Sequence, residues 1–139
     1  MIDLQVITAF VADHCTKAKA IHIVYLFGSH AHGDARDNSD IDFGVLVDHQ
    51  GYAQDPLGAS SEAFVLAAKA GQLFDVATDV LILNNASLEL AHEVVATGIC
   101  LYHTDMDQRL EYESKIIGLY FDFAPFLKQL RAGALARVL

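Results

Sequence analysis

Two short apolar segments, joined by a polar stretch that begins with a glycine and ends with two aspartates, constrain the fold of this chain most strongly. Apart from His22, residues 21–27 are branched or aromatic and stop at Gly28, and apart from Asp42, residues 41–47 are again apolar. Segments of this kind predict buried β-strands, and Gly28 predicts a turn that needs glycine's backbone freedom. Side chains alternate across a strand, so Asp40 and Asp42 are expected on one face, about 6.6 Å apart along it.

This arrangement favours phosphate and metal chemistry. Two carboxylates on one strand face can share divalent cations. Gly28 and Ser29 open a short helical stretch, whose backbone N–H groups together with the serine hydroxyl can bind a phosphate. An isolated pair of aspartates at the start of a strand is usually just solvated, but the upstream Gly-Ser pair favours a catalytic role. A phosphate site beside a cation site predicts transfer from a nucleoside triphosphate.

The whole stretch, residues 28–42, reads GSHAHGDARDNSDID. It resembles the signature of the nucleotidyltransferases related to DNA polymerase β, most closely their minimal stand-alone members. The resemblance implies an α/β (α+β) fold with a small mixed sheet, flanking helices and a long C-terminal helix. Such proteins are commonly encoded beside a HEPN-domain toxin, so it also implies a cognate HEPN toxin as partner, in a hetero-oligomer.

The resemblance also assigns roles to individual residues. Asp40 and Asp42 would hold two Mg²⁺ ions around the triphosphate of the substrate ATP. Gly28 and Ser29 would bind its β- and γ-phosphates, and Ser39 would add a further contact.

A third carboxylate is expected from the next strand, residues 77–83. Desolvating a lone carboxylate in an apolar strand is costly, so a strand aspartate lies at an exposed edge or faces a cation. Asp79 fits the family's catalytic and metal-binding position best. Asp75 is the rival candidate, because it lies four residues earlier and would share the same strand face.

His30 and His32 stand where the family usually has arginine. A pair two residues apart, with no cysteine or third histidine nearby, is a weak zinc site, and a phosphate contact or an exposed loop is favoured. Histidine in place of arginine bears on how strongly the triphosphate is held and whether its binding depends on pH.

Composition limits the remaining possibilities. The chain has 9 basic and 18 acidic residues, a formal charge of −9, which argues against direct nucleic-acid binding. No apolar stretch approaches the roughly 20 residues that span a membrane. No export signal is visible, so Cys15 and Cys100 are expected to be reduced core thiols of a cytoplasmic protein.

The 139 residues predict one domain, with a catalytic core at residues 1–103 and a C-terminal helical extension at residues 104–139. Pro125 is expected to kink or interrupt that extension, whose apolar residues go nearly all the way round and face either the core or a partner. The other expected elements are helices at residues 2–20, 60–70 and 88–97, loops at 48–51 and 54–58, a strand at 99–102 and a frayed tail at 131–139.

The resemblance implies a specific reaction, in which AMP is transferred from ATP to a tyrosine hydroxyl of the toxin and neutralises it. One alternative is a small-molecule acceptor, as in antibiotic-modifying nucleotidyltransferases, although 139 residues leave little room for their additional substrate domain. Another is an antitoxin that acts by binding alone.

Overall fold

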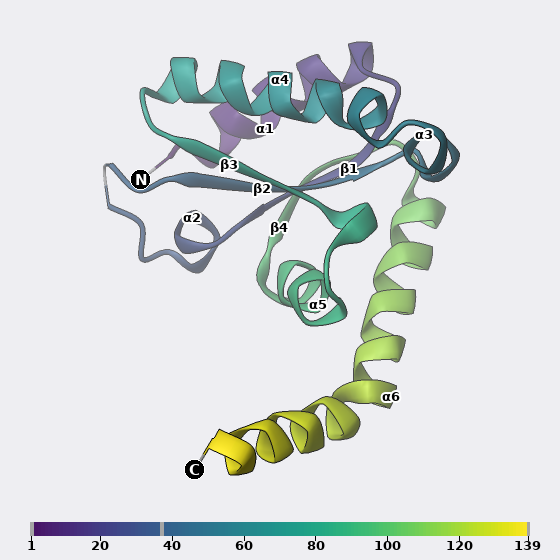
Figure 1. Ribbon diagram of the computed structural model, residues 1–139. Coiled ribbons are helices and arrows are strands. Elements are labelled where there is room, and N and C mark those ends of the chain that lie inside the picture. The colour runs from purple at the N-terminus through teal and green to yellow at the C-terminus, as the bar shows by residue number, and fades with distance from the viewer. Residues whose placement is uncertain (1, 37, 139) are drawn as a thin grey trace.

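The computed structural model describes residues 2–36 and 38–138, with the side chains up to residue 133 (Figure 1). Its elements are, in chain order, α1 (Leu4–Lys17), β1 (Ile21–Phe27), α2 (Ser29–His32), β2 (Ile41–Val47), α3 (His49–Gln54), α4 (Pro56–Phe74), β3 (Thr78–Ile82), the 3₁₀ turn η1 (Leu83–Asn85), α5 (Leu88–Thr97), β4 (Ile99–His103) and α6 (Met106–Val138).

The four strands form one mixed sheet in the order β3-β2-β1-β4. Strand β1 is antiparallel to both β2 and β4, whereas β3 is parallel to β2. Helices α1 and α4 cover one face, and α5 and α6 lie on the other (Figure 1). The expected small mixed sheet flanked by helices is confirmed.

Side chains of β1 alternate between the two layers. Val24 and Leu26 join the larger core beneath α1 and α4, whereas Ile23 and Tyr25 join a second cluster with Val94 of α5. All of these residues are buried. Because both faces are covered, the strand from Ile23 to Phe27 carries no alternating charged residues.

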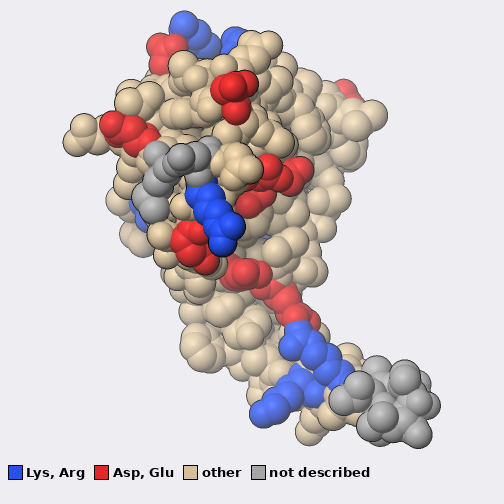
Figure 2. All heavy atoms as spheres, turned by 90° about the vertical axis from the view of Figure 1, so that its left-hand side faces the viewer, with Lys and Arg blue, Asp and Glu red and all other residues tan. Residues whose placement is uncertain are grey.

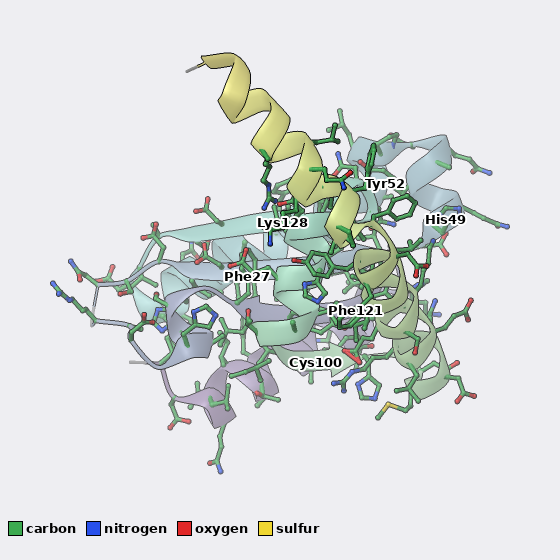
Figure 3. The ribbon with its side chains drawn as sticks, turned by 90° about the horizontal axis from the view of Figure 1, so that it is seen from below. Phe27, His49, Tyr52, Cys100, Phe121 and Lys128 are labelled. Atoms are coloured by element: carbon green, nitrogen blue, oxygen red, sulfur yellow. The ribbon has the colours of Figure 1, made fainter. Side chains whose placement is uncertain are left out.

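Helix α6 is long, continuous and only partly covered. Tyr112 and Ile116 in its first half pack on the layer formed by α5. The helix then bends and extends away from the sheet (Figures 1 and 3). Pro125 lies inside it, and a proline removes one helical hydrogen bond, so the residue bends the helix without ending it. Phe121 is 71% exposed and Phe126 56%, so these aromatic residues are not core.

Two expected loops are helical instead. Asp48 accepts a hydrogen bond from the Gly51 amide at 2.8 Å and starts α3. Asp55 accepts one from the Gly58 amide at 3.1 Å and starts α4, with Pro56 in its first turn, where proline is well tolerated.

Two expected helix ends are also wrong. Helix α4 passes through Gly71 and ends at Phe74. The expected frayed tail is helical through Val138, and Leu139 lies outside the described residues.

Two buried tyrosines on the α6 side allow a matched stability test. The Tyr25 hydroxyl donates to Oε2 of Glu113 at 2.9 Å and joins β1 to α6. The Tyr112 hydroxyl is buried with no partner among the described residues, and burial raises its pKa to about 12. Tyr25→Phe should lower the free energy of unfolding by about 2 kcal/mol because it breaks a hydrogen bond to a charged group.

Tyr112→Phe removes a hydroxyl that makes no hydrogen bond, so it should leave that free energy unchanged or raise it. Urea denaturation followed by circular dichroism measures both variants. An equal loss of stability in the two variants would contradict a stabilising role for the hydrogen bond between Tyr25 and Glu113.

Candidate active site

Strand register brings three aspartates to one end of the sheet. In the parallel pairing of β2 with β3, Asp42 lies directly beside Asp79, and Asp40 stands two residues before Asp42. Their neighbours Ile41, Phe43 and Val80 point to the opposite face, into the core beneath α4. Asp40 is close enough for its charge to act on Asp42, and the common face of the two aspartates stays a prediction. The side of the molecule where β2 and β3 begin carries several acidic groups (Figure 2).

The rival third carboxylate lies elsewhere. Asp75 adopts a left-handed conformation with φ 54° and caps the C-terminus of α4. It therefore does not share a strand face with Asp79, and that expectation is wrong. Asp79, exposed within β3, is the aspartate that neighbours Asp42.

The carboxylates affect one another's charge. The pKa of Asp42 is raised, first by partial burial and then by the negative charges of Asp79 and Asp40, while His30 partly opposes the shift. A raised carboxylate pKa means that the ionised group is disfavoured in its folded environment. A cation at this position would relieve that cost.

The three side chains have the chemistry of a magnesium site without yet forming a closed set of ligands. Across residues 2–36 and 38–138, no three His, Cys, Asp or Glu side chains converge as a metal centre. Carboxylate oxygens are nevertheless the ligands that Mg²⁺ prefers. Two of these aspartates are exposed, so their side chains are free to turn toward an ion.

Gly28 is required at the turn between β1 and α2 for two independent reasons. Its φ of +75° is strained for residues with a side chain. A Cβ at this position would also stand 2.3 Å from Oδ2 of Asp42, well inside van der Waals contact. The turn that carries Ser29 therefore lies directly against the central carboxylate, as a combined phosphate and cation site requires.

Ser39 and His30 stabilise the segment that leads into Asp40. The Ser39 hydroxyl accepts a hydrogen bond from the Arg36 amide at 2.7 Å, and the Ser39 carbonyl accepts one from Nε2 of His30 at 3.0 Å. A hydroxyl that accepts can still donate, so the phosphate contact predicted for Ser39 stays a prediction.

The two histidines differ in environment. His30 is only 8% exposed, and its Nδ1 is buried with no partner in the described part of the chain, whereas His32 is exposed. His32 is exposed as expected but is the last residue of α2 and does not lie in a loop, and the exposed-loop interpretation is wrong for His30. Sequence reasoning missed this positioning role of His30, and the only signal for it was a histidine where the family has arginine.

Known proteins match both the sequence and the fold. The family model described as Polymerase beta, Nucleotidyltransferase matches residues 11–107. The protein adenylyltransferase MntA of Aphanizomenon flos-aquae is 31% identical over 105 residues, which cover 73% of this chain and 70% of that protein. The protein adenylyltransferase MntA of Shewanella oneidensis is 35% identical over 100 residues, which cover 72% of this chain and 66% of that protein.

Solved structures extend the similarity to nearly the whole chain. A toxin–antitoxin crystal structure with AMP-PNP has a TM-score of 0.67 at 27% identity and covers 94% of this chain and 97% of its own. The tri-AMPylated Shewanella oneidensis HEPN toxin in complex with its MNT antitoxin gives a TM-score of 0.65 at 25% identity, covering 98% of both chains. With the matched family model, these similarities show that the chain belongs to the polymerase β-type nucleotidyltransferases.

Proposed function

We propose that this protein is an antitoxin that transfers AMP from ATP to a tyrosine hydroxyl of a cognate HEPN-domain toxin. The observation that carries the proposal is the register of β2 and β3, which sets Asp42 beside Asp79 while Gly28 packs against Asp42. The named relatives are protein adenylyltransferases, and one related complex holds an AMPylated HEPN toxin, which supports this acceptor.

In the proposed reaction the tyrosine oxygen attacks the α-phosphorus of ATP, and the bond to the pyrophosphate breaks. Gly28 and Ser29 bind the β- and γ-phosphates through backbone N–H groups and a hydroxyl. Asp40, Asp42 and Asp79 would hold two Mg²⁺ ions, which would supply activation of the acceptor oxygen and neutralisation of the charge on the leaving pyrophosphate. Asp79, which is exposed, takes the tyrosine proton.

Charge and surface are consistent with a protein partner. The chain's net charge of −9 complements a partner that binds RNA through basic residues. None of the helices in the described residues is long and apolar enough to cross a membrane. Both cysteines are free thiols, and burial raises the pKa of Cys15 to about 12, so this thiol is an unreactive part of the core.

The first test is transfer itself. The protein is incubated with its partner toxin, Mg²⁺ and ATP labelled at the α-phosphate. Label should appear on a toxin tyrosine and be lost, by roughly a thousandfold or more in rate, in the double variant Asp40→Asn with Asp42→Asn.

Asp75→Asn is the matched control, because asparagine also tolerates the left-handed conformation; it should transfer at the normal rate. Label on a small alcohol would support an antibiotic-type enzyme instead, and toxin binding without label would support neutralisation by binding alone. Transfer retained in the double variant would reject the site.

The raised pKa of Asp42 predicts a trade-off between stability and metal binding. Its folded pKa lies above the ordinary value, so ionised Asp42 destabilises the fold at neutral pH, and this cost disappears as the pH falls through the raised pKa. In EDTA at pH 7, Asp42→Asn should therefore melt at a higher temperature than the parent protein. The difference should vanish at acidic pH.

Added Mg²⁺ should raise the melting temperature of the parent protein more than that of the variant. Thermal melts at several pH values, with and without Mg²⁺, measure both effects. An Asp42→Asn variant that is less stable than the parent at pH 7 would count against the electrostatic cost.

His30 is a positioning residue in this scheme, and glutamine provides a rescue test. The amide nitrogen of glutamine reaches about as far as Nε2 of histidine, so His30→Gln can keep the donor to the Ser39 carbonyl. His30→Ala loses it and should lower kcat by roughly fivefold or more. Steady-state kinetics for the two variants test this role. An equal loss of kcat in both would show that the hydrogen bond to the Ser39 carbonyl does not support catalysis.

A further inference from the structure

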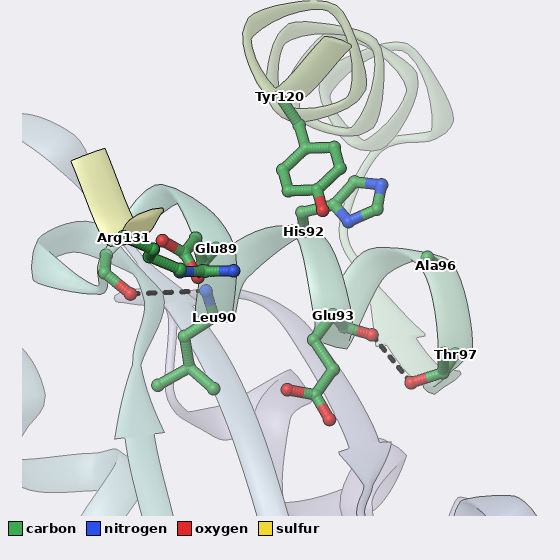
Figure 4. Close-up of a pocket in the computed structure, with 9 residues that line it drawn as sticks. Glu89, Leu90, His92, Glu93, Ala96, Thr97, Tyr120 and Arg131 are labelled. Atoms are coloured by element: carbon green, nitrogen blue, oxygen red, sulfur yellow. Dashed lines mark hydrogen bonds and ion pairs between the residues drawn. The ribbon is translucent and has the colours of Figure 1, made fainter. Parts of the chain in front are cut away.

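Helices α5 and α6 enclose a cavity of about 550 Å³ on the same face of the sheet as Asp42 and Asp79 (Figure 4). Pockets of this size hold small ligands, and none of the residues given catalytic roles lines it. Its walls come from one side of α5 and from two positions on α6, Tyr120 and Arg131.

A flat aromatic surface forms part of the pocket wall. His92 of α5 and Tyr120 of α6 are stacked, with ring centroids 3.6 Å apart and planes only 3° from parallel (Figure 4). Both residues are half-buried. Parallel rings that reach a pocket form a surface on which another planar group can stack.

The charge of the pocket selects the kind of planar group. Glu89 and Glu93 both line it, and Arg131 forms an ion pair with Glu89. The wall therefore carries two carboxylates against one guanidinium, which disfavours a phosphate. Carboxylate oxygens accept hydrogen bonds, so a neutral ring with amino donors fits better.

The pocket is connected to the candidate active site through the end of α5. Thr97 lines the pocket and is the last residue of that helix. The next residue, Gly98, packs so closely that a Cβ there would stand 3.1 Å from the Leu26 carbonyl oxygen, and Ile99 pairs with Leu26. Leu26 lies two residues before Gly28, so the end of α5 that contributes Thr97 to the pocket lies beside the strand that leads into the phosphate turn.

From this geometry we propose that the α5–α6 pocket binds the adenine base of the nucleotide whose phosphates lie at Gly28 and Ser29. The base stacks on the His92–Tyr120 pair and directs its amino group toward Glu93. This inference rests on the proposed function, because it takes ATP as the substrate of the neighbouring site.

The test measures binding apart from catalysis. Isothermal titration calorimetry with Mg²⁺ gives the Kd of ATP and of tripolyphosphate, which has the same phosphate chain but no base. His92→Ala and Tyr120→Ala should each raise the Kd of ATP roughly tenfold and leave that of tripolyphosphate unchanged. Tyr120→Phe keeps the ring and should bind ATP like the parent protein.

The control variant is Phe123→Ala, an exposed aromatic residue of α6 that does not line the pocket. It should leave both Kd values unchanged. An unchanged Kd for ATP in both alanine variants, or an equal loss of tripolyphosphate binding, would overturn the assignment of the pocket.

The two proposals fail in different ways. A parent protein that binds ATP through His92 and Tyr120 but transfers no AMP to the toxin would keep the pocket and reject the reaction. A parent protein that transfers AMP while the alanine variants bind ATP normally would keep the reaction and reject the pocket.

Discussion

Repulsion between carboxylates held side by side by strand pairing is the constraint on which the rest of the site depends. In the parallel register of β2 and β3, Asp42 lies beside Asp79. Partial burial of Asp42 prevents water from fully screening the repulsion between the two carboxylates. Seven residues of β2, four of them fully buried beneath α4, hold this register. The apolar core thus stabilises an arrangement of charges that would not form by itself.

The same central carboxylate also dictates the sequence of the turn opposite. Gly28 approaches Asp42 so closely that any side chain would collide with it, and its backbone adopts a conformation that other residues avoid. His30 then joins the short helix α2 to the carbonyl just before Asp40. The proposed phosphate turn and the proposed cation ligands are therefore packed together, at the adjoining ends of two antiparallel strands.

The site was predictable from sequence because it depends on short-range spacing. Strands at residues 21–27 and 41–47 have the predicted bounds, since apolar runs ending at glycine or aspartate leave little choice. The helices around residues 48–58 were not predictable in the same way. Asp48 and Asp55 occur in stretches that read as loops, and only their side-chain bonds to Gly51 and Gly58 turn them into helix caps.

Asp75 shows why residue spacing alone does not predict side-chain positions where one element ends and the next begins. Counted along an ideal strand it shares a face with Asp79, but α4 persists past Gly71 and places it in a left-handed cap. Packing of α4 on the sheet decides that helix end, and the residues that do the packing lie elsewhere in the chain. A glycine inside a helix is tolerated when tertiary contacts offset its cost.

In helix α6, the apolar pattern of the sequence and the burial seen in the structure differ. Its all-round apolar surface predicts burial of more than one face, whereas the described chain covers only the side that meets α5. Leu110, Ile117 and Phe121 recur at seven- and four-residue spacing along one uncovered line of the helix, and all three are exposed. An exposed apolar line of this kind lowers the solubility of a monomer and is characteristic of surfaces that bind other proteins. The same helix lines the α5–α6 pocket, so under the two proposals a toxin bound to this line would touch the same element as the nucleotide.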